Sequence, residues 1–385
     1  RYVTESDKQY RSPVTEGQKL VSTIVSEALG IDRVGIDDDF FELGGHSLAA
    51  VKVMRRLEEQ TGQRLPVTSL FEAPTVEKLS LLLQLDKKAI SWKSLVPIKP
   101  EGKKPPLYVV HGSGLTVLIF KAFAKGMDPD QPVYGLQARG LNGEEPFDTM
   151  EDIAAYYISE ILDHNPDGPY CLAGYSFGGI VAFEMAKQLA AMGKEIKMLA
   201  IFDTNVENDN YSLPTGQRMK KKILRQFPKM RFILHSLNKY PKETLQYQWN
   251  FIQNKFRPLF EKTGLLKKRK TEEDMLSVYA SKINEKHYKA YFSYKMSPYN
   301  GVVHLFRVRK RLYYLDDPEY LGWKPYALQG VKIHTIPGDH KTFLISPNDK
   351  ELAEIFRAVL NECGETTKSS NKSSSFESEA LLKLV

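Results

Sequence analysis

Apolar residues in the first part of the chain recur every three or four positions, which is the spacing of a helix face. One such run begins at Ser47 and continues through Leu48, Val51, Met54 and Leu57. Similar runs over 13–29, which Gly30 ends, and over 76–83 predict two further helices. We therefore expect residues 12–84 to form a small all-α helical bundle.

From residue 107 onward, short apolar strands alternate with helical segments. The predicted strands cover 107–110, 133–136, 170–173, 196–202, 302–308 and 331–336. The predicted helices cover 150–162, 180–192 and 350–360. This order favours a largely parallel sheet with helices on both faces, and it puts ligand chemistry at the carboxyl ends of the strands. Residues 107–363 are expected to be this α/β domain.

Three stretches depart from the alternation. Residues 85–106 are rich in Lys and Pro, which predicts an extended linker between the two units. Residues 364–385 are rich in Ser and Lys and are expected to be a disordered tail. Between the predicted strands 196–202 and 302–308 lies a long insert, in which Tyr247, Trp249, Phe251 and Phe256 either line a cavity or belong to an ordinary core.

The insert also carries the excess of positive charge in the chain. The chain has 385 residues and a formal net charge of +7, but 218–270 alone holds 16 Lys/Arg against 2 Asp/Glu. Apolar residues are interleaved with these charges at Ile223, Phe227, Phe232, Ile233 and Leu237. An amphipathic helix with a solvated basic face is favoured over a nucleic-acid patch or a membrane-surface helix, so neither nucleic acid nor membrane is expected as a partner.

The two cysteines limit the class of protein further. Cys171 lies in a strand pattern and Cys363 in a helical one, so no disulfide framework and no metal site is expected. Both fit a core in a reducing compartment, and with no signal peptide or membrane-spanning run we expect a cytoplasmic protein. The chain begins with Arg1, which suggests a piece of a longer polypeptide.

The strongest chemical motif is Gly174-Tyr-Ser-Phe-Gly178, set between a strand pattern and a helix pattern. In this context a tight turn strains the serine backbone and exposes Ser176 Oγ at the start of a helix. The backbone N–H of Phe177 can there stabilise an oxyanion. The alternative is a glycine-rich turn with an inert serine, because the motif alone is common.

Two further residues complete a catalytic set. Asp203 ends an apolar strand, and His340 follows the last strand in the loop Pro337-Gly-Asp-His. The order Ser176, Asp203, His340 is that of the α/β-hydrolases, with His340 as base and Asp203 orienting it. Singly, Asp203 also fits a helix cap and His340 a solvated loop. Asp339 is a weaker candidate for the acid, and the other histidines fall inside strands, helices or polar segments: His164, His235, His287, His304 and His334.

The turn His111-Gly-Ser-Gly114 follows the first strand of the domain. Its glycines allow a backbone N–H to point into the site, and Ser113 is the predicted second donor of an oxyanion hole with Phe177. The alternative is a simple tight turn.

Ser47 is a second serine at a helix start, after an acidic loop that ends in Gly44-Gly-His-Ser47. A helix cap is the ordinary explanation for a serine in this place. The other interpretation is an attachment point, because an anion on Oγ would lie at the positive end of the helix.

Two longer stretches of sequence resemble known families. Asp-Asp-Phe-Phe-Glu-Leu-Gly-Gly-His-Ser-Leu at 38–48, with 64–79, resembles the carrier-protein signature of nonribosomal peptide synthetases. The resemblance implies 4'-phosphopantetheine on Ser47, carrying an acyl or peptidyl thioester. Gly-Tyr-Ser-Phe-Gly-Gly, Phe-Asp-Thr, Pro-Gly-Asp-His, residues 291–307 and Leu321-Gly-Trp323 resemble the type I thioesterase domain that ends such synthetases. This implies an α/β-hydrolase with a helical lid at about 205–288.

The sequence therefore predicts a carrier–thioesterase didomain in which an acyl group passes from Ser47 to Ser176 and leaves by hydrolysis or internal attack. Upstream adenylation and condensation domains and a phosphopantetheinyl transferase are the expected partners. Three alternatives stay open: joining of two acyl units, as in single-module quinone- or furanone-forming synthetases; a non-catalytic interaction module; and a nucleic-acid binder acting through the basic insert.

Overall fold

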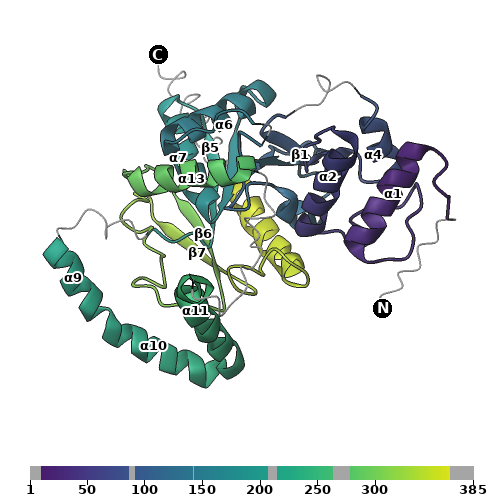
Figure 1. Cartoon of the computed structure of the whole chain (residues 1–385). Helices are drawn as coiled ribbons and strands as arrows, with labels where there is room; N and C mark the ends of the chain where they lie inside the picture. Colours follow the sequence, from purple (N-terminus) through teal and green to yellow (C-terminus); the bar gives the residue numbers. More distant parts are fainter. Residues whose placement is uncertain (1–9, 86–91, 142, 207–214, 263–277, 365–385) are drawn as a thin grey trace, which may run out of the picture.

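The computed structural model describes residues 10–85, 92–141, 143–206, 215–262 and 278–364, and these form a small helical unit beside a larger α/β unit (Figure 1). The helical unit contains α1 (Glu16–Leu29), α2 (Ser47–Thr61), α3 (Ser69–Glu72) and α4 (Val76–Leu82). The sequence predicted three of these; α3 has only four residues, too few for a helical period. The three run where expected, and α1 begins at Glu16 because Thr15 caps it, exchanging hydrogen bonds with Gln18.

The larger unit is built on a seven-stranded sheet in the order β1-β3-β2-β4-β5-β6-β7. The strands are β1 (Leu95–Lys99), β2 (Leu107–Val110), β3 (Val133–Leu136), β4 (Tyr170–Tyr175), β5 (Ile196–Phe202), β6 (Val303–Val308) and β7 (Val331–Ile336). Every pair is parallel except β1 with β3. The parallel sheet predicted from the alternation is confirmed.

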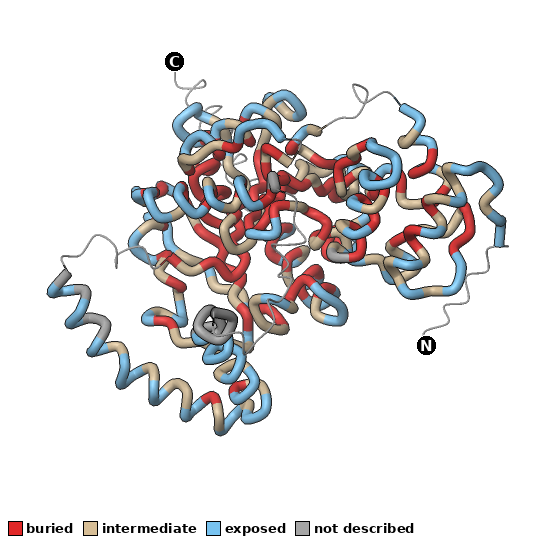
Figure 2. The backbone as a smooth tube through the Cα atoms, in the orientation of Figure 1, coloured by how far each residue is buried: buried red, intermediate tan, exposed pale blue. Residues whose placement is uncertain are grey.

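Helices cover both faces of the sheet, and each face has its own buried core (Figure 2). On one face lie α6 (Met150–His164) and α7 (Phe177–Ala191). On the other lie η2 (Leu118–Phe120), α5 (Lys121–Lys125) and the helix 348–364. The strands between the two layers are buried on both sides, and β2 is buried at all four positions.

The prediction that residues 85–106 form an extended linker is wrong for one segment. Leu95–Lys99 forms β1, which pairs antiparallel with β3 at the edge of the sheet. Pro97 made this stretch look like a connector, but an edge strand tolerates proline because one side of its ladder has no partner. Residues 86–91 lie outside the described part of the chain, as do 365–385, where the disordered tail was expected.

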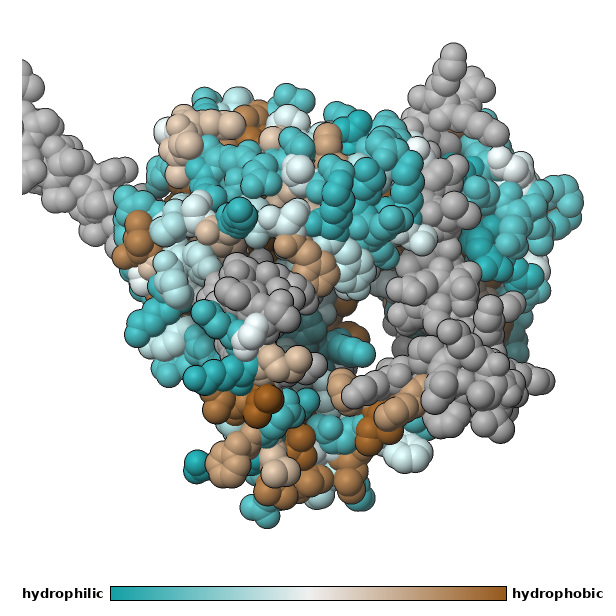
Figure 3. All heavy atoms as spheres, turned by 60° about the vertical axis from the view of Figure 1, so that its left-hand side comes forward, coloured by the Kyte–Doolittle hydropathy of each residue, from teal (hydrophilic) through white to brown (hydrophobic). Residues whose placement is uncertain are grey.

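The insert is helical, as predicted, with α9 (Thr215–Leu224), α10 (Gln226–Lys239), α11 (Pro241–Lys262) and α13 (Val278–Ser293). In Figure 1, α9 and α10 extend away from the sheet, whereas α13 lies against the body. The apolar face of α9 and α10 is exposed, and apolar side chains gather over the lower part of Figure 3. The exposed side chains include Met219, Ile223, Phe227, Met230 and Leu234, which are 56–76% exposed.

The two units touch directly. Leu118 of η2 is buried in the core of the helical unit, and Phe71 of α3 packs against both that core and one core of the α/β unit. The Lys121 ammonium lies 3.3 Å from the centre of the Phe41 ring, and Gln137 Nε2 donates to Thr68 Oγ1 at 3.3 Å. The units are thus joined by packing as well as by the chain. Within the described residues, no helix has the length and apolar character needed to cross a membrane.

Candidate active site

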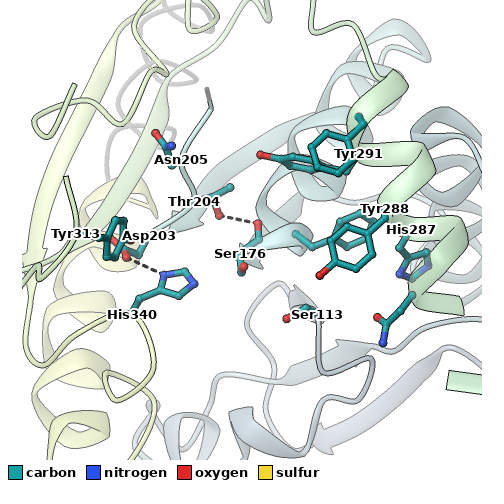
Figure 4. Close-up of a pocket in the computed structure, with 13 residues that line it drawn as sticks. Ser113, Ser176, Asp203, Thr204, Asn205, His287, Tyr288, Tyr291, Tyr313 and His340 are labelled. Carbon is teal, nitrogen blue, oxygen red and sulfur yellow. Dashed lines mark hydrogen bonds and ion pairs between the residues drawn. The ribbon is translucent and has the colours of Figure 1, made fainter. Parts of the chain in front are cut away.

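Ser176 occupies the turn between β4 and α7, where its backbone has φ 54° and ψ −118°. Such a positive φ is strained for a residue with a side chain. Glycines make the turn possible: a Cβ on Gly174 would lie 2.0 Å from Gly178 O, and one on Gly178 would lie 2.3 Å from His111 O. The predicted tight turn is therefore present, with Ser176 at the N-terminal end of α7 (Figure 4).

The same turn is tied to the neighbouring strand. Thr204 Oγ1, just beyond β5, donates to Ser176 O at 2.9 Å. A Cβ on Gly179 would lie 2.1 Å from that hydroxyl, so only glycine fits there. These contacts fix the serine backbone relative to the carboxyl end of β5.

Asp203 and His340 meet at this end of the sheet. Asp203 directly follows β5, its side chain is fully buried, and its Oδ2 lies 2.8 Å from His340 Nδ1. In Figure 4 the opposite edge of the imidazole points toward Ser176. Asp203 also has a positive φ of 45°, so two strained residues lie at the ends of two adjacent strands.

The other oxygen of Asp203 has two partners. Val308 N donates to Oδ1 at 3.1 Å and Arg311 Nη2 at 2.6 Å. Arg311 was missed in the sequence because Arg309-Lys310-Arg311 resembles a solvated basic run. Its position directly after an apolar strand is the signal that could have found it. Only the structure shows that the Arg311 side chain is 9% exposed.

The other candidates for the catalytic acid and base are engaged in other contacts. Asp339 Oδ1 accepts hydrogen bonds from the backbone N–H groups of Lys341 and Thr342, so it organises its own loop. His304 and His334 stack on each other on β6 and β7, and His164 bonds to the Tyr108 hydroxyl.

A cavity of about 370 Å³ lies over the turn, and Ser113, Ser176, Phe177, Asp203 and His340 all line it. The structure thus brings together all five residues predicted for this site. The far wall comes from α13 and the loop after β6, with the side chains of Asn284, His287, Tyr288, Tyr291, Phe292 and Tyr313. The aromatics proposed as lining at 247–256 are not in this set, and Trp249 is 61% exposed.

His287 was also missed. Its ring stacks on Phe177 at 4.7 Å between ring centres and on His111 at 5.5 Å. His111 Nδ1 lies 2.5 Å from Gly112 O, so it carries a proton, and Nε2 accepts from the Tyr157 hydroxyl at 2.9 Å. Burial lowers the pKa of His111 to about 4, and burial with the nearby His111 lowers the pKa of His287 to about 3. A stack of neutral rings therefore holds Phe177 in place.

Ser47 lies outside this cavity, at the first position of α2. The residue before it, His46, is extended and makes no side-chain capping bond, which leaves the first N–H groups of α2 without a side-chain cap. Open space surrounds Gly44, where a Cβ would meet nothing within 4 Å. A partly exposed serine beside uncapped N–H groups suits a phosphate ester, so these residues fit a phosphopantetheine group.

The sheet order, the two helix layers and the serine at a strand-to-helix turn make the larger unit an α/β-hydrolase domain. Comparison with known families is more specific. Residues 105–360 match the Thioesterase domain family, and the chain belongs to it. Residues 19–83 match the Phosphopantetheine attachment site family, so the helical unit is a carrier domain with 4'-phosphopantetheine as its covalent group.

Individual proteins that are similar to this chain include nonribosomal peptide synthetases. A dimodular nonribosomal peptide synthase from Bacillus subtilis (strain 168) is 41% identical over 194 residues, which is 50% of this chain and 8% of the relative. Indigoidine synthase from Dickeya dadantii (strain 3937) is 38% identical over 180 residues, 46% of this chain and 12% of the relative. A solved four-domain nonribosomal peptide synthetase matches 93% of this chain and 27% of its own at 23% identity, with a TM-score of 0.54, which supports the fold. The chain spans 2–21% of the length of these and the other curated relatives that it matches.

Proposed function

We propose that this carrier–thioesterase chain releases the acyl or peptidyl product of a nonribosomal peptide synthetase, with Ser176 as nucleophile, His340 as base and Asp203 as the residue that orients the imidazole. The observation that carries the proposal is the 2.8 Å contact between His340 Nδ1 and buried Asp203, beside a serine held in a strained turn on the same cavity. This is the geometry that nucleophilic acyl transfer requires.

In the first half-reaction, His340 Nε2 takes the proton of Ser176 Oγ as the oxygen attacks the carbonyl carbon of an acyl thioester. The backbone N–H groups of Phe177 and Ser113 are the proposed donors to the oxyanion. The C–S bond breaks, His340 returns the proton to the leaving sulfur, and the acyl group is left as an ester on Ser176.

In the second half-reaction, water or a nucleophile within the acyl chain gives its proton to His340 and attacks the ester. Ser176 regains its proton from His340 and the product leaves. The wall of Tyr288, Tyr291 and Phe292 restricts the space around the ester, so it selects among nucleophiles and acyl groups.

Ser47 is the proposed attachment residue of the carrier domain. When bound there, 4'-phosphopantetheine supplies a thiol that holds the acyl group as a thioester. The uncapped N–H groups of α2 stabilise the phosphate charge next to Ser47. A phosphopantetheinyl transferase is therefore a partner, and upstream adenylation and condensation domains supply the acyl group. A cytoplasmic location stays a prediction from the sequence.

Release by joining two acyl units is the second candidate, since one relative is an indigoidine synthase. It uses the same ester on Ser176, with a second acyl group as nucleophile in place of water. Product mass separates the two reactions, because joining gives a product built from two acyl units.

The test is single-turnover release from chain loaded at Ser47 with acyl-pantetheine groups. We expect S176A to keep the loaded mass while product formation falls by about a thousandfold or more. S293A, which changes an exposed serine on α13, is the matched control and should release product like the wild type. Release by S176A at the wild-type rate would refute the proposed nucleophile.

A further inference from the structure

We propose that Arg311 is a positioning residue of this site: it fixes the carboxylate of Asp203, and through that carboxylate it holds the His340 imidazole in the orientation that faces Ser176. This rests on the proposed roles of Ser176, Asp203 and His340.

The contact between Arg311 and Asp203 is buried. Arg311 Nη2 lies 2.6 Å from Asp203 Oδ1, and the side chains are 9% and 0% exposed. Solvent therefore screens this pair far less than a surface ion pair. A buried charge that loses its partner is strongly destabilised, so the two groups depend on each other.

The carboxylate orientation depends on the same contact. Oδ2 faces His340 Nδ1, while Oδ1 takes hydrogen bonds from Val308 N and from Arg311. Without Arg311, one backbone N–H at 3.1 Å would remain to hold Oδ1. Rotation of the carboxylate would then change the hydrogen bond that directs the imidazole toward Ser176.

Arg311 is itself held from a second side. Its Nη1 donates to the Tyr313 hydroxyl at 2.7 Å, and its guanidinium carbon lies 5.0 Å from the centre of the Tyr313 ring. Tyr313 lines the cavity and is labelled beside Asp203 in Figure 4. One guanidinium thus links the carboxylate to the cavity wall.

The neighbouring basic residues point elsewhere. Lys310 Nζ pairs with Glu243 on α11 at 2.8 Å, and Arg309 Nη2 pairs with Glu351 at 2.8 Å. Of the three consecutive basic residues, Arg311 is the one directed at Asp203. The arrangement is therefore specific to one position in the run.

The charge of Arg311 matters as well as its hydrogen bonds. Asp203 carries a buried carboxylate, and a buried charge that loses its partner is strongly destabilised. R311M leaves Oδ1 with the Val308 N–H as its hydrogen-bond donor, whereas R311K keeps a cation beside it.

The other titratable groups around the cluster remain neutral or face away. Burial raises the pKa of Tyr175, at the end of β4, to about 12, and its hydroxyl donates to His340 O. Burial and Asp203 raise the pKa of Tyr313, with Arg311 opposing them and Tyr247 of α11 adding a small increase. Asp339 is bound to the amides of its own loop. Arg311 is then the group whose removal changes the charge beside Asp203.

The experiment measures the single-turnover rate of Ser176 acylation by loaded carrier for wild type, R311M and R311K. For R311M we expect roughly tenfold slower acylation, because the imidazole loses its fixed orientation. R311K retains the charge and should restore most of the rate. R309M, which removes the exposed partner of Glu351, is the matched control and should follow the wild type.

A double-mutant cycle tests whether Arg311 acts through Asp203. R311M should add little to the loss caused by D203N, because the carboxylate charge is already gone. Thermal unfolding of each variant accounts for loss of folded protein. Acylation by R311M at the wild-type rate, or full additivity with D203N, would overturn the inference. Unimpaired S176A or H340A would instead refute the proposed site, so the two failures are distinguishable.

Discussion

Both units of the molecule place a serine at the start of a helix, but the two serines stand in opposite surroundings. Ser47 follows an extended His46 and a loop with open space at Gly44. Ser176 sits at φ 54° between Gly174 and Gly178, where the backbone leaves no room for a Cβ. Both serines are partly exposed, so the contrast is between a loop with free space at Gly44 and a turn whose backbone is confined.

The difference matches the proposed chemistry. Each serine is next to the free N–H groups of a helix start, which favour negative charge. Ser47 would receive a group from another enzyme, which needs access to the hydroxyl and no base of its own. Ser176 would react with the help of His340, which needs fixed geometry. Both serines therefore lie at a helix N-terminus, and the backbone around each one determines which reaction it suits.

The largest expected effect comes from removing one serine and testing the other. We expect S47A to gain no mass with coenzyme A and a phosphopantetheinyl transferase, since the proposed attachment oxygen is gone. Ser176 should still react with a fluorophosphonate probe at the wild-type rate, because Ser47 does not line its cavity. Mass spectrometry of both modifications makes the measurement. A mass gain on S47A would place the attachment elsewhere.

Substitution of a glycine in the Ser176 turn should have the next largest effect on the reactivity of Ser176. In G178A the new methyl group would lie 2.3 Å from His111 O, so backbone must move. We expect probe labelling of Ser176 to fall by roughly a hundredfold, in line with the loss of an oxyanion donor. G216A on α9, where a Cβ meets nothing within 4 Å, is the control. Labelling of G178A at the G216A rate would contradict this account of the turn.

The neutral ring stack predicts how acid affects folding. The folded pKa values of His111 and His287, about 4 and 3, lie below the ordinary 6.5, so the unfolded chain binds more protons in between. The contribution of these residues is thus complete above about pH 6.5 and is lost as pH falls, by up to about 1.4 kcal/mol per pH unit for each histidine. Urea unfolding from pH 7 to 5 measures this slope.

H287F keeps a flat ring against Phe177 but removes one titrating group, so it should reduce the slope. H235F, on the exposed side of α10, serves as the control and should leave it unchanged. If both variants kept the wild-type pH dependence, the acid response would have to come from other groups.

The smallest expected effect concerns the contact between the two units. The Lys121 ammonium lies 3.3 Å from the Phe41 ring centre, and such contacts contribute about 0.5–2 kcal/mol. K121A should slow transfer from the carrier a few-fold and leave fluorophosphonate labelling unchanged. K125A, at the end of the same short helix, is the control. Equal effects on transfer and labelling would mean that Lys121 supports the hydrolase domain and not docking.

Local sequence patterns predicted the features that depend on neighbouring residues. A few consecutive residues are enough to predict each of three features: the turn at Ser176, the strand ending at Asp203 and the helix starting at Ser47. Their order in the chain was enough to expect Ser176, Asp203 and His340 at one edge of the sheet. The structure places all three on one cavity.

Features that depend on distant contacts were missed. The residues next to Arg311 in the sequence do not indicate that Arg311 contacts Asp203. Arg309 and Lys310 would have been equally plausible from the sequence. The sequence left open whether the aromatic residues at 247–256 line the cavity, and only packing shows that aromatic residues of α13 line it instead. β1 was missed because Pro97 obscures an edge strand whose partner, β3, follows about forty residues later.

Leu118 belongs by sequence to the hydrolase unit and by packing to the carrier's core. Separating the carrier domain from the hydrolase domain would expose this side chain to water, and exposing a buried leucine costs about 1.5–3 kcal/mol. The carrier domain on its own would therefore have a gap in its core where Leu118 is packed in the whole chain.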